Sequence, residues 1–128
     1  MSMDSRDKQN ANPLLRSFSY AISGICLALR SERNMKIHVS ISVLVIGSGF
    51  FFRISKQEWL FVFFAIGGML ALELANTAIE RVVDLVTEEY HPLAKQAKDL
   101  AAGAVFIFAI ISVIIGIIIF GPYLLEIF

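Results

Sequence analysis

The chain has 128 residues, of which 57% are hydrophobic and 17% are charged, and its formal net charge is zero. A single soluble domain of this length has too little interior for so many large apolar side chains, so we expect one membrane-embedded domain. The balanced charge gives no indication of a nucleic-acid partner, and we expect none. The single cysteine, Cys26, excludes an internal disulfide and a multi-cysteine metal site.

The N-terminal third begins with twelve polar residues, MSMDSRDKQNAN, which carry charges of both signs. They lack the apolar segment of a cleavable signal peptide, and we predict a disordered tail over residues 1–12. Apolar side chains then recur at helical spacing in residues 13–32: Leu14, Leu15, Phe18, Ile22, Ile25 and Leu29. This pattern predicts an amphipathic helix lying on the membrane surface, with packing against a partner as the alternative.

Three later segments have the composition of membrane-spanning helices, and together with residues 13–32 they form a single domain over 13–128. We predict spans at about 35–53, 57–86 and 94–122, because uncharged runs at 37–52, 59–72 and 100–125 occupy them. The middle run reaches the length of a span only by including Glu73 and Asn76, which places two polar side chains at membrane depth. The predicted fold is therefore an all-α membrane protein with one surface helix and three spans.

The lysines and arginines predict the orientation of these spans. Six precede the first span and three lie between the second and third: Arg6, Lys8, Arg16, Arg30, Arg33 and Lys36, and then Arg81, Lys95 and Lys98. Only Arg53 and Lys56 lie between the first and second spans. Since basic residues favour the cytoplasmic side, we predict a multi-pass plasma-membrane protein with a cytoplasmic N-terminus.

A polar stripe is expected on the second span. Glu73, Asn76, Glu80 and Asp84 would fall within about 80° of one another on a helix, over roughly 16 Å of its length. Ionisable side chains at membrane depth are costly and usually functional. Further polar residues gather at the same membrane face: Glu32, Glu88, Glu89, Tyr90, His91, Lys98 and Asp99.

Several carboxylates and a lysine, without a His/Cys cluster, favour a hard cation such as Mg²⁺ over zinc. Such a set suits phosphoryl transfer: carboxylates bind the metal and remove a proton, and an ammonium group balances phosphate charge. The residues alone leave open a second reading, in which the carboxylates form a proton or cation relay in a small oligomeric transporter or channel.

The stretch ELANTAIERVVDLVTEEYHPLAKQAKDLAAGAV, residues 73–105, closely resembles the signature of the small prokaryotic diacylglycerol kinase family. The resemblance extends over about 14–120 and implies a homotrimer whose active sites are shared between subunits. It also implies transfer of the γ-phosphate of MgATP to a lipid hydroxyl, with ATP and a membrane lipid as partners and Mg²⁺ as cofactor.

The same resemblance implies roles for individual residues. Glu73 would be the general base, supported by Asn76, and Glu32 and Glu80 would bind magnesium. The expected nucleotide contacts are Tyr20, Glu32, Glu80, Glu89, Tyr90, His91, Lys98 and Asp99. The expected lipid contacts are Glu73, Ser17 and Ala102.

Two features bear on the lipid substrate. The run SERNMKIH is similar to the Gram-positive branch of the family, whose members mainly phosphorylate undecaprenol. The tryptophans of the diacylglycerol-specific Gram-negative members are absent near Tyr20, and Ala102 stands where some members have serine. The resemblance therefore implies an undecaprenol kinase, with a diacylglycerol kinase as the alternative.

Overall fold

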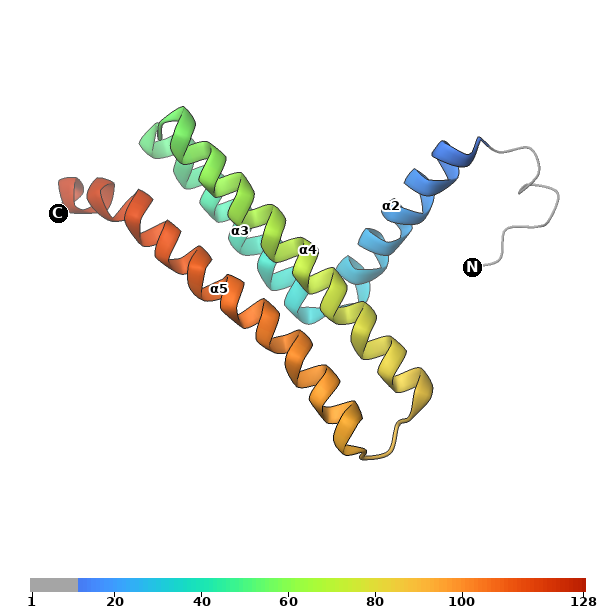
Figure 1. Ribbon diagram of the computed structural model, residues 1–128. Helices are drawn as coiled ribbons and strands as arrows, with labels where there is room; N and C mark the ends of the chain where they lie inside the picture. Colours follow the sequence, from blue (N-terminus) through green and yellow to red (C-terminus); the bar gives the residue numbers. More distant parts are fainter. Residues whose placement is uncertain (1–11) are drawn as a thin grey trace.

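The computed structural model describes residues 12–128, and they form four helices (Figure 1). These are α2 (Pro13–Ser31), α3 (Arg33–Phe52), α4 (Lys56–Val86) and α5 (Pro92–Ile127). The described residues contain no strand, and α3, α4 and α5 are long and apolar enough to cross a membrane. The predicted all-helical fold with three membrane-length helices is confirmed. The tail predicted over 1–12 lies outside the described residues, apart from Asn12.

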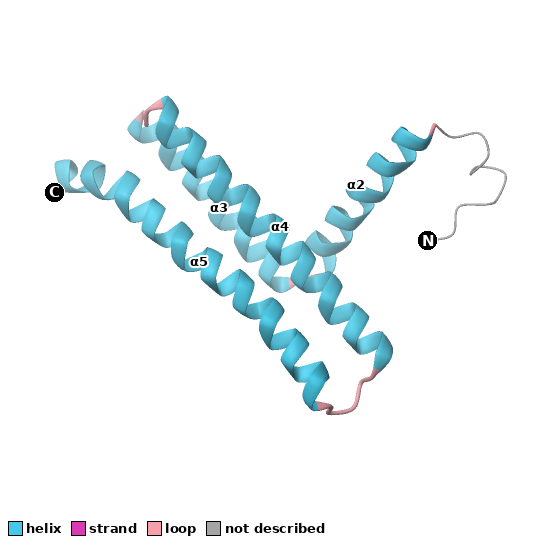
Figure 2. Cartoon of the chain, in the orientation of Figure 1, coloured by secondary structure: helices cyan, strands magenta, loops and turns pink. Residues whose placement is uncertain are grey.

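The connections between helices are short (Figure 2). Local hydrogen bonds cap several of the helix ends. The Asn12 side chain accepts a hydrogen bond from the Leu14 N–H at 3.0 Å, and Pro13 occupies the first turn of α2. Glu32, in an extended conformation, is the single residue between α2 and α3. This break turns the chain, and α2 leans away from the three long helices (Figure 1).

The turn between α3 and α4 combines two capping devices. Arg53 adopts the left-handed conformation (φ 53°, ψ 53°), and the Ile54 N–H donates to the Gly49 carbonyl at 3.1 Å. Ser55 and Glu58 then form a capping box at the start of α4, in which each side chain accepts a hydrogen bond from the other's backbone N–H. These bonds satisfy backbone groups that helix ends would otherwise leave unpaired.

The helix α4 packs against both α3 and α5, and close approach depends on glycine. Phe108 of α5 lies so near Gly68 that a Cβ at this position would be 2.2 Å from the ring. Trp59 also lies close over Gly49, where a Cβ would be 2.6 Å from the indole. Small residues at such contacts are typical of packing between membrane helices.

A buried apolar cluster lies near the α3–α4 turn and is formed by Ile54, Val62 and Ile119. The helix α5 continues to Ile127, beyond the predicted end near 122, although Pro122 lies inside it and cannot donate a backbone hydrogen bond. Tyr123 holds this extra turn, because its ring stacks on Phe52 at 5.7 Å and its hydroxyl donates to Glu58 at 2.8 Å.

The opposite ends of α4 and α5 extend past the α2–α3 junction (Figures 1 and 2). With 31 and 36 residues, α4 and α5 are about 46 and 54 Å long at 1.5 Å per residue. Both exceed the roughly 30 Å of a bilayer's hydrocarbon core. This projecting hairpin carries most of the polar residues singled out in the sequence.

Candidate active site at the polar end of the helices

The polar stripe lies on α4 as predicted, and its burial decreases along the helix. Glu73 and Asn76 are buried, with exposed fractions of 3% and 7%, whereas Glu80 is half-buried and Asp84 is exposed. The Asn76 Nδ2 donates to Glu80 Oε1 at 3.3 Å, which joins two members of the stripe. The stripe therefore runs from a secluded carboxylate at membrane depth to an accessible one near the α4–α5 loop.

Two buried polar atoms beside the stripe have no hydrogen-bond partner within residues 12–128. They are the Asn76 Oδ1 and the hydroxyl oxygen of Thr77, which is 7% exposed. An unpaired buried polar group costs about 1–3 kcal/mol, so such groups in a folded protein call for a partner. A bound substrate or a second subunit would supply one.

The predicted magnesium ligands, Glu32 and Glu80, have different partners in the single chain. Arg81 Nη2 contacts Glu32 Oε1 at 3.2 Å and donates to the Ser31 hydroxyl at 2.9 Å, which ties the α2–α3 junction to α4. Within residues 12–128 no group of three or more His, Cys, Asp or Glu side chains is placed to hold a metal ion.

The chemistry of these two carboxylates nevertheless fits Mg²⁺. Their described hydrogen bonds and ion pair use Oε1 of each, and no described contact occupies Oε2 of Glu32 or of Glu80. Magnesium commonly takes one or two carboxylates together with substrate phosphates and water, and it does not need a complete protein cage.

A cavity of about 350 Å³ opens between the end of α4, the following loop and the start of α5. It is lined by five of the eight predicted nucleotide-contact residues: Glu89, Tyr90, His91, Lys98 and Asp99. Lys98 Nζ contacts Asp84 Oδ1 at 2.7 Å across the cavity, and Lys95 pairs with Asp99. The short loop between α4 and α5 thus brings the polar residues of the two helix ends around one cavity.

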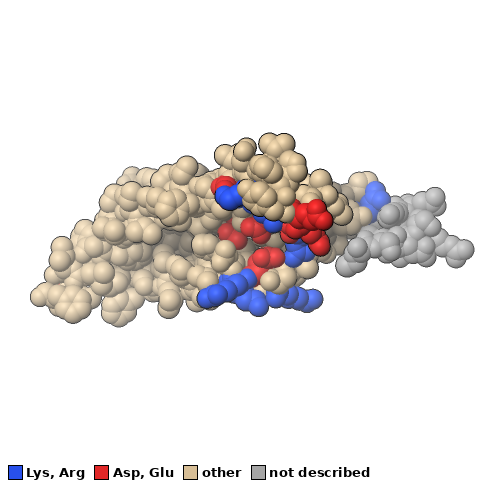
Figure 3. Space-filling view, turned by 90° about the horizontal axis from the view of Figure 1, so that it is seen from below, with Lys and Arg blue, Asp and Glu red and all other residues tan. Residues whose placement is uncertain are grey.

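The loop geometry that positions these residues is local. The His91 Nδ1 accepts a hydrogen bond from the Leu93 N–H at 3.1 Å and so caps α5, while Pro92 occupies the first turn. Thr87 Oγ1 accepts from the Glu89 N–H at 3.2 Å. On the face drawn in Figure 3, charged side chains gather toward this loop and α2, whereas the part of that face toward the C-terminus is uncharged.

Besides Glu32, Glu73 and Glu80, three predicted contact residues lie outside the lining of this cavity. Tyr20 lines a separate groove of about 400 Å³ between α2 and α4, together with Thr77 and Arg81. The Ser17 hydroxyl donates to the Pro13 carbonyl of its own helix at 3.1 Å, and Ala102 is exposed on α5. No described contact joins Ser17 or Ala102 to Glu73, so their roles in lipid binding stay predictions.

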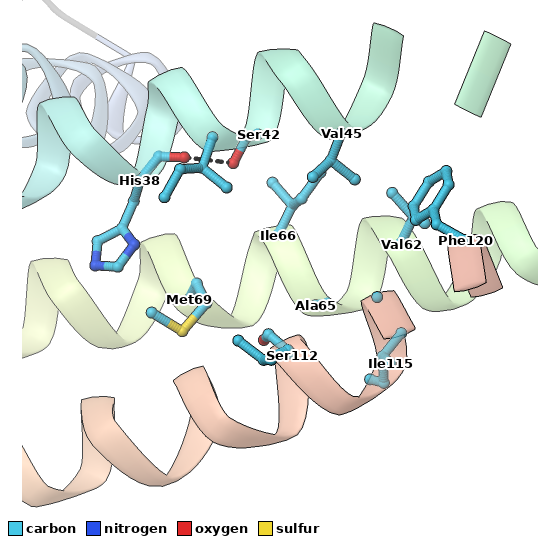
Figure 4. Close-up of a pocket in the computed structure, with 13 residues that line it drawn as sticks. His38, Ser42, Val45, Val62, Ala65, Ile66, Met69, Ser112, Ile115 and Phe120 are labelled. Atoms are coloured by element: carbon cyan, nitrogen blue, oxygen red, sulfur yellow. Dashed lines mark hydrogen bonds between the residues drawn. The ribbon is translucent and has the colours of Figure 1, made fainter. Parts of the chain in front are cut away.

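Sequence reasoning missed His38, a residue of α3 that faces the deepest member of the stripe. Its Nε2 lies 3.8 Å from Glu73 Oε2. His38 also lines a cavity of about 260 Å³ between α3, α4 and α5, with Met69 and Ser112 (Figure 4). The available signal was a lone histidine in an otherwise apolar span, which we counted only as an uncharged residue of that span.

Comparison with known proteins decides the family. The model of the family "Prokaryotic diacylglycerol kinase" matches residues 19–120. The chain belongs to this family. The predicted resemblance is therefore confirmed, and the match covers α3 and α4 completely together with most of α2 and α5.

Relatives of this family member carry two names. It is 51% identical to the undecaprenol kinase of Bacillus subtilis over 123 residues, which cover 95% of this chain and 100% of the relative. It is 42% identical to a diacylglycerol kinase of Synechocystis over 119 residues, which cover 92% of this chain and 68% of the relative. A diacylglycerol kinase of Pseudomonas aeruginosa is 34% identical over 94 residues, covering 73% and 76%.

Family membership and these names identify the chain as a lipid kinase of the membrane and exclude the transporter or channel reading. The three membrane-length helices agree with this assignment.

Proposed function

We propose that this protein transfers the γ-phosphate of ATP to the hydroxyl group of undecaprenol and so makes undecaprenyl phosphate. The observation that carries this proposal is the 51% identity, over the whole relative, to a protein named undecaprenol kinase. Diacylglycerol is the second candidate acceptor, because the relative at 42% identity is named diacylglycerol kinase.

The arrangement of the site supports nucleotide binding near the C-terminal end of α4 and lipid binding deeper along the same helix. The cavity at the α4–α5 loop, with Lys98 and Asp99 in its lining, is polar and suits a nucleotide at the membrane surface. Lys98 would balance phosphate charge, for which an ammonium group is well suited. Glu73, buried deeper on the same helix, would meet the hydroxyl of a lipid held in the membrane.

Glu32 and Glu80 would hold Mg²⁺, which supplies charge neutralisation for the phosphates of ATP when it is bound. Asn76 connects this region to the base, because its amide donates to Glu80 and lies one turn from Glu73. Glu73 then accepts the proton of the lipid hydroxyl as the oxygen attacks the γ-phosphorus, and the bond from that phosphorus to ADP breaks.

We also propose that the active protein is a homotrimer with sites shared between subunits. The single chain leaves a large apolar area open, including Leu85 at 87% exposure and Leu100 at 75%. Its buried Asn76 and Thr77 atoms lack partners, and Glu32 and Glu80 have separate ones. A neighbouring subunit would complete these contacts. The distribution of lysine and arginine supports a cytoplasmic N-terminus and a cytoplasmic α4–α5 loop.

The proposed mechanism is tested by Glu73→Gln, which keeps the shape of the side chain and removes its ability to take a proton. The kcat for phosphate transfer from labelled ATP should fall by about 10²–10⁴-fold, while binding of MgATP is retained. Glu58→Gln is the matched control at the opposite end of α4, since glutamine can still accept from the Ser55 N–H and the Tyr123 hydroxyl. A Glu73→Gln protein with normal turnover would rule out the base assignment.

A further inference from the structure

Glu73 needs a partner that the mechanism described so far does not provide. Its exposed fraction is 3%, and it lies on a membrane-length helix after a run of apolar residues. An ionised carboxylate in such surroundings costs several kcal/mol unless a basic or donor group faces it. The nearby Asn76 amide donates to Glu80 instead.

Within residues 12–128, His38 is the one basic side chain that pairs with Glu73. The separation between His38 Nε2 and Glu73 Oε2 is 3.8 Å, slightly beyond a direct hydrogen bond. Catalytic hydrogen bonds are often long before substrate binds and shorten in the reacting complex. The separation of His38 from Glu73 is therefore compatible with a general base and a supporting histidine before the lipid binds.

The ring of His38 borders an open space between three helices. Its carbonyl accepts a hydrogen bond from the Ser42 hydroxyl at 2.7 Å, one turn along α3. Its side chain lines the cavity between α3, α4 and α5, where Figure 4 shows it near Met69. The cavity therefore leaves space beside the His38 ring.

Building on the proposed kinase function, we propose that His38 is a positioning residue whose unprotonated Nε2 takes up the proton that Glu73 removes, and which then holds the Glu73 carboxylate as an imidazolium. The O–H bond of the lipid breaks, its proton passes to Glu73, and its oxygen forms the bond to the γ-phosphorus while ADP leaves. The proton then passes from Glu73 to His38 Nε2, and the carboxylate returns to its ionised form.

Histidine is suited to this task because an imidazole nitrogen is the proton acceptor that enzymes use most often in general acid–base catalysis. Once protonated, the imidazolium faces the carboxylate across a short distance in surroundings of low polarity. Opposite charges so placed stabilise each other, and this favours completed transfer of the proton away from the lipid oxygen. In catalytic triads a carboxylate likewise stabilises the imidazolium that forms beside it.

The test compares His38→Gln, His38→Phe and the control Ser42→Ala, which lines the same cavity but does not contact Glu73. Glutamine keeps an N–H donor toward Glu73 but cannot take a proton. We expect kcat, measured per folded protein with undecaprenol and MgATP, to fall about 10–100-fold in His38→Gln and further in His38→Phe. We expect KM for both substrates to stay unchanged, and Ser42→Ala to match the wild type.

Wild-type turnover in His38→Gln would overturn the role of His38, as would a rise in KM at unchanged kcat. If His38→Phe does not fold, the comparison of His38→Gln with Ser42→Ala still decides whether His38 contributes to turnover. An assay in which the wild type itself labels no lipid would instead refute the proposed kinase function.

A readout independent of activity is the ¹⁵N spectrum of the imidazoles, since the chain has only two histidines, His38 and His91. Glu73→Gln should shift the His38 signal and leave the His91 signal in place. An unchanged His38 signal would show that the two side chains do not interact.

Discussion

The close contact between α4 and α5 at Gly68 gives a prediction about stability with a matched control in the adjacent residue. In Gly68→Ala the new Cβ would be 2.2 Å from Phe108 Cζ and 2.5 Å from Cε1. Non-bonded carbon atoms prefer separations of about 3.5–4.0 Å, so the ring must move by more than about 1 Å. At Gly67 a Cβ meets nothing within 4 Å.

The magnitude follows from two opposing terms. Replacing glycine by alanine inside a helix stabilises it by roughly 0.5–1 kcal/mol at either position. Overpacking at Gly68 costs about 1–3 kcal/mol, because Phe108 also packs near Phe64, at a ring separation of 6.3 Å. Gly67→Ala should therefore be slightly stabilising, and Gly68→Ala should be less stable than Gly67→Ala by about 1–3 kcal/mol.

The assay is reversible denaturation of the purified protein in detergent micelles, followed by helix content. The double variant Gly68→Ala/Phe108→Leu should recover part of the loss, because the smaller side chain vacates the space that the new methyl group needs. Equal stability of Gly68→Ala and Gly67→Ala would refute the described packing of α5 on α4.

Three further predictions concern the site and the assembly. Glu80→Gln, which can still accept from the Asn76 amide, should raise the Mg²⁺ concentration for half-maximal activity by about tenfold or more, and unchanged magnesium dependence would reject Glu80 as a ligand. Lys98→Met should raise KM for ATP about tenfold, equivalent to about 1.4 kcal/mol. Lys56→Met, at the opposite end of α4 from the cavity, should leave KM for ATP unchanged. Chemical crosslinking in mild detergent should give a three-chain species, and an active enzyme that is strictly monomeric would contradict the shared-site proposal.

The helices could be predicted from sequence because their signals are local. Long uncharged runs predict α3 and α5, and the polar stripe of α4 follows from the spacing of four residues alone. The end of α5 was harder to place, since Pro122 usually weakens a helix and the contacts of Tyr123 that support it come from α3 and α4. Those contacts exist only after the chain has folded.

The candidate site shows the same division between local and long-range information. Glu89, Tyr90 and His91 are consecutive, so their common location was evident, and the cavity they share with Lys98 follows from the short α4–α5 loop. The contact between Arg81 and Glu32 joins residues 49 apart in the chain and has no local signal. The approach of His38 to Glu73 likewise depends on how α3 packs against α4.

The most direct test of the proposed function offers undecaprenol and diacylglycerol side by side in mixed micelles, with labelled ATP and Mg²⁺. The account predicts faster labelling of undecaprenol, and loss of labelling of either lipid in Glu73→Gln. Preferential labelling of diacylglycerol would contradict the proposed substrate and retain the mechanism. No label in either lipid, from protein shown to be folded, would contradict the kinase function itself.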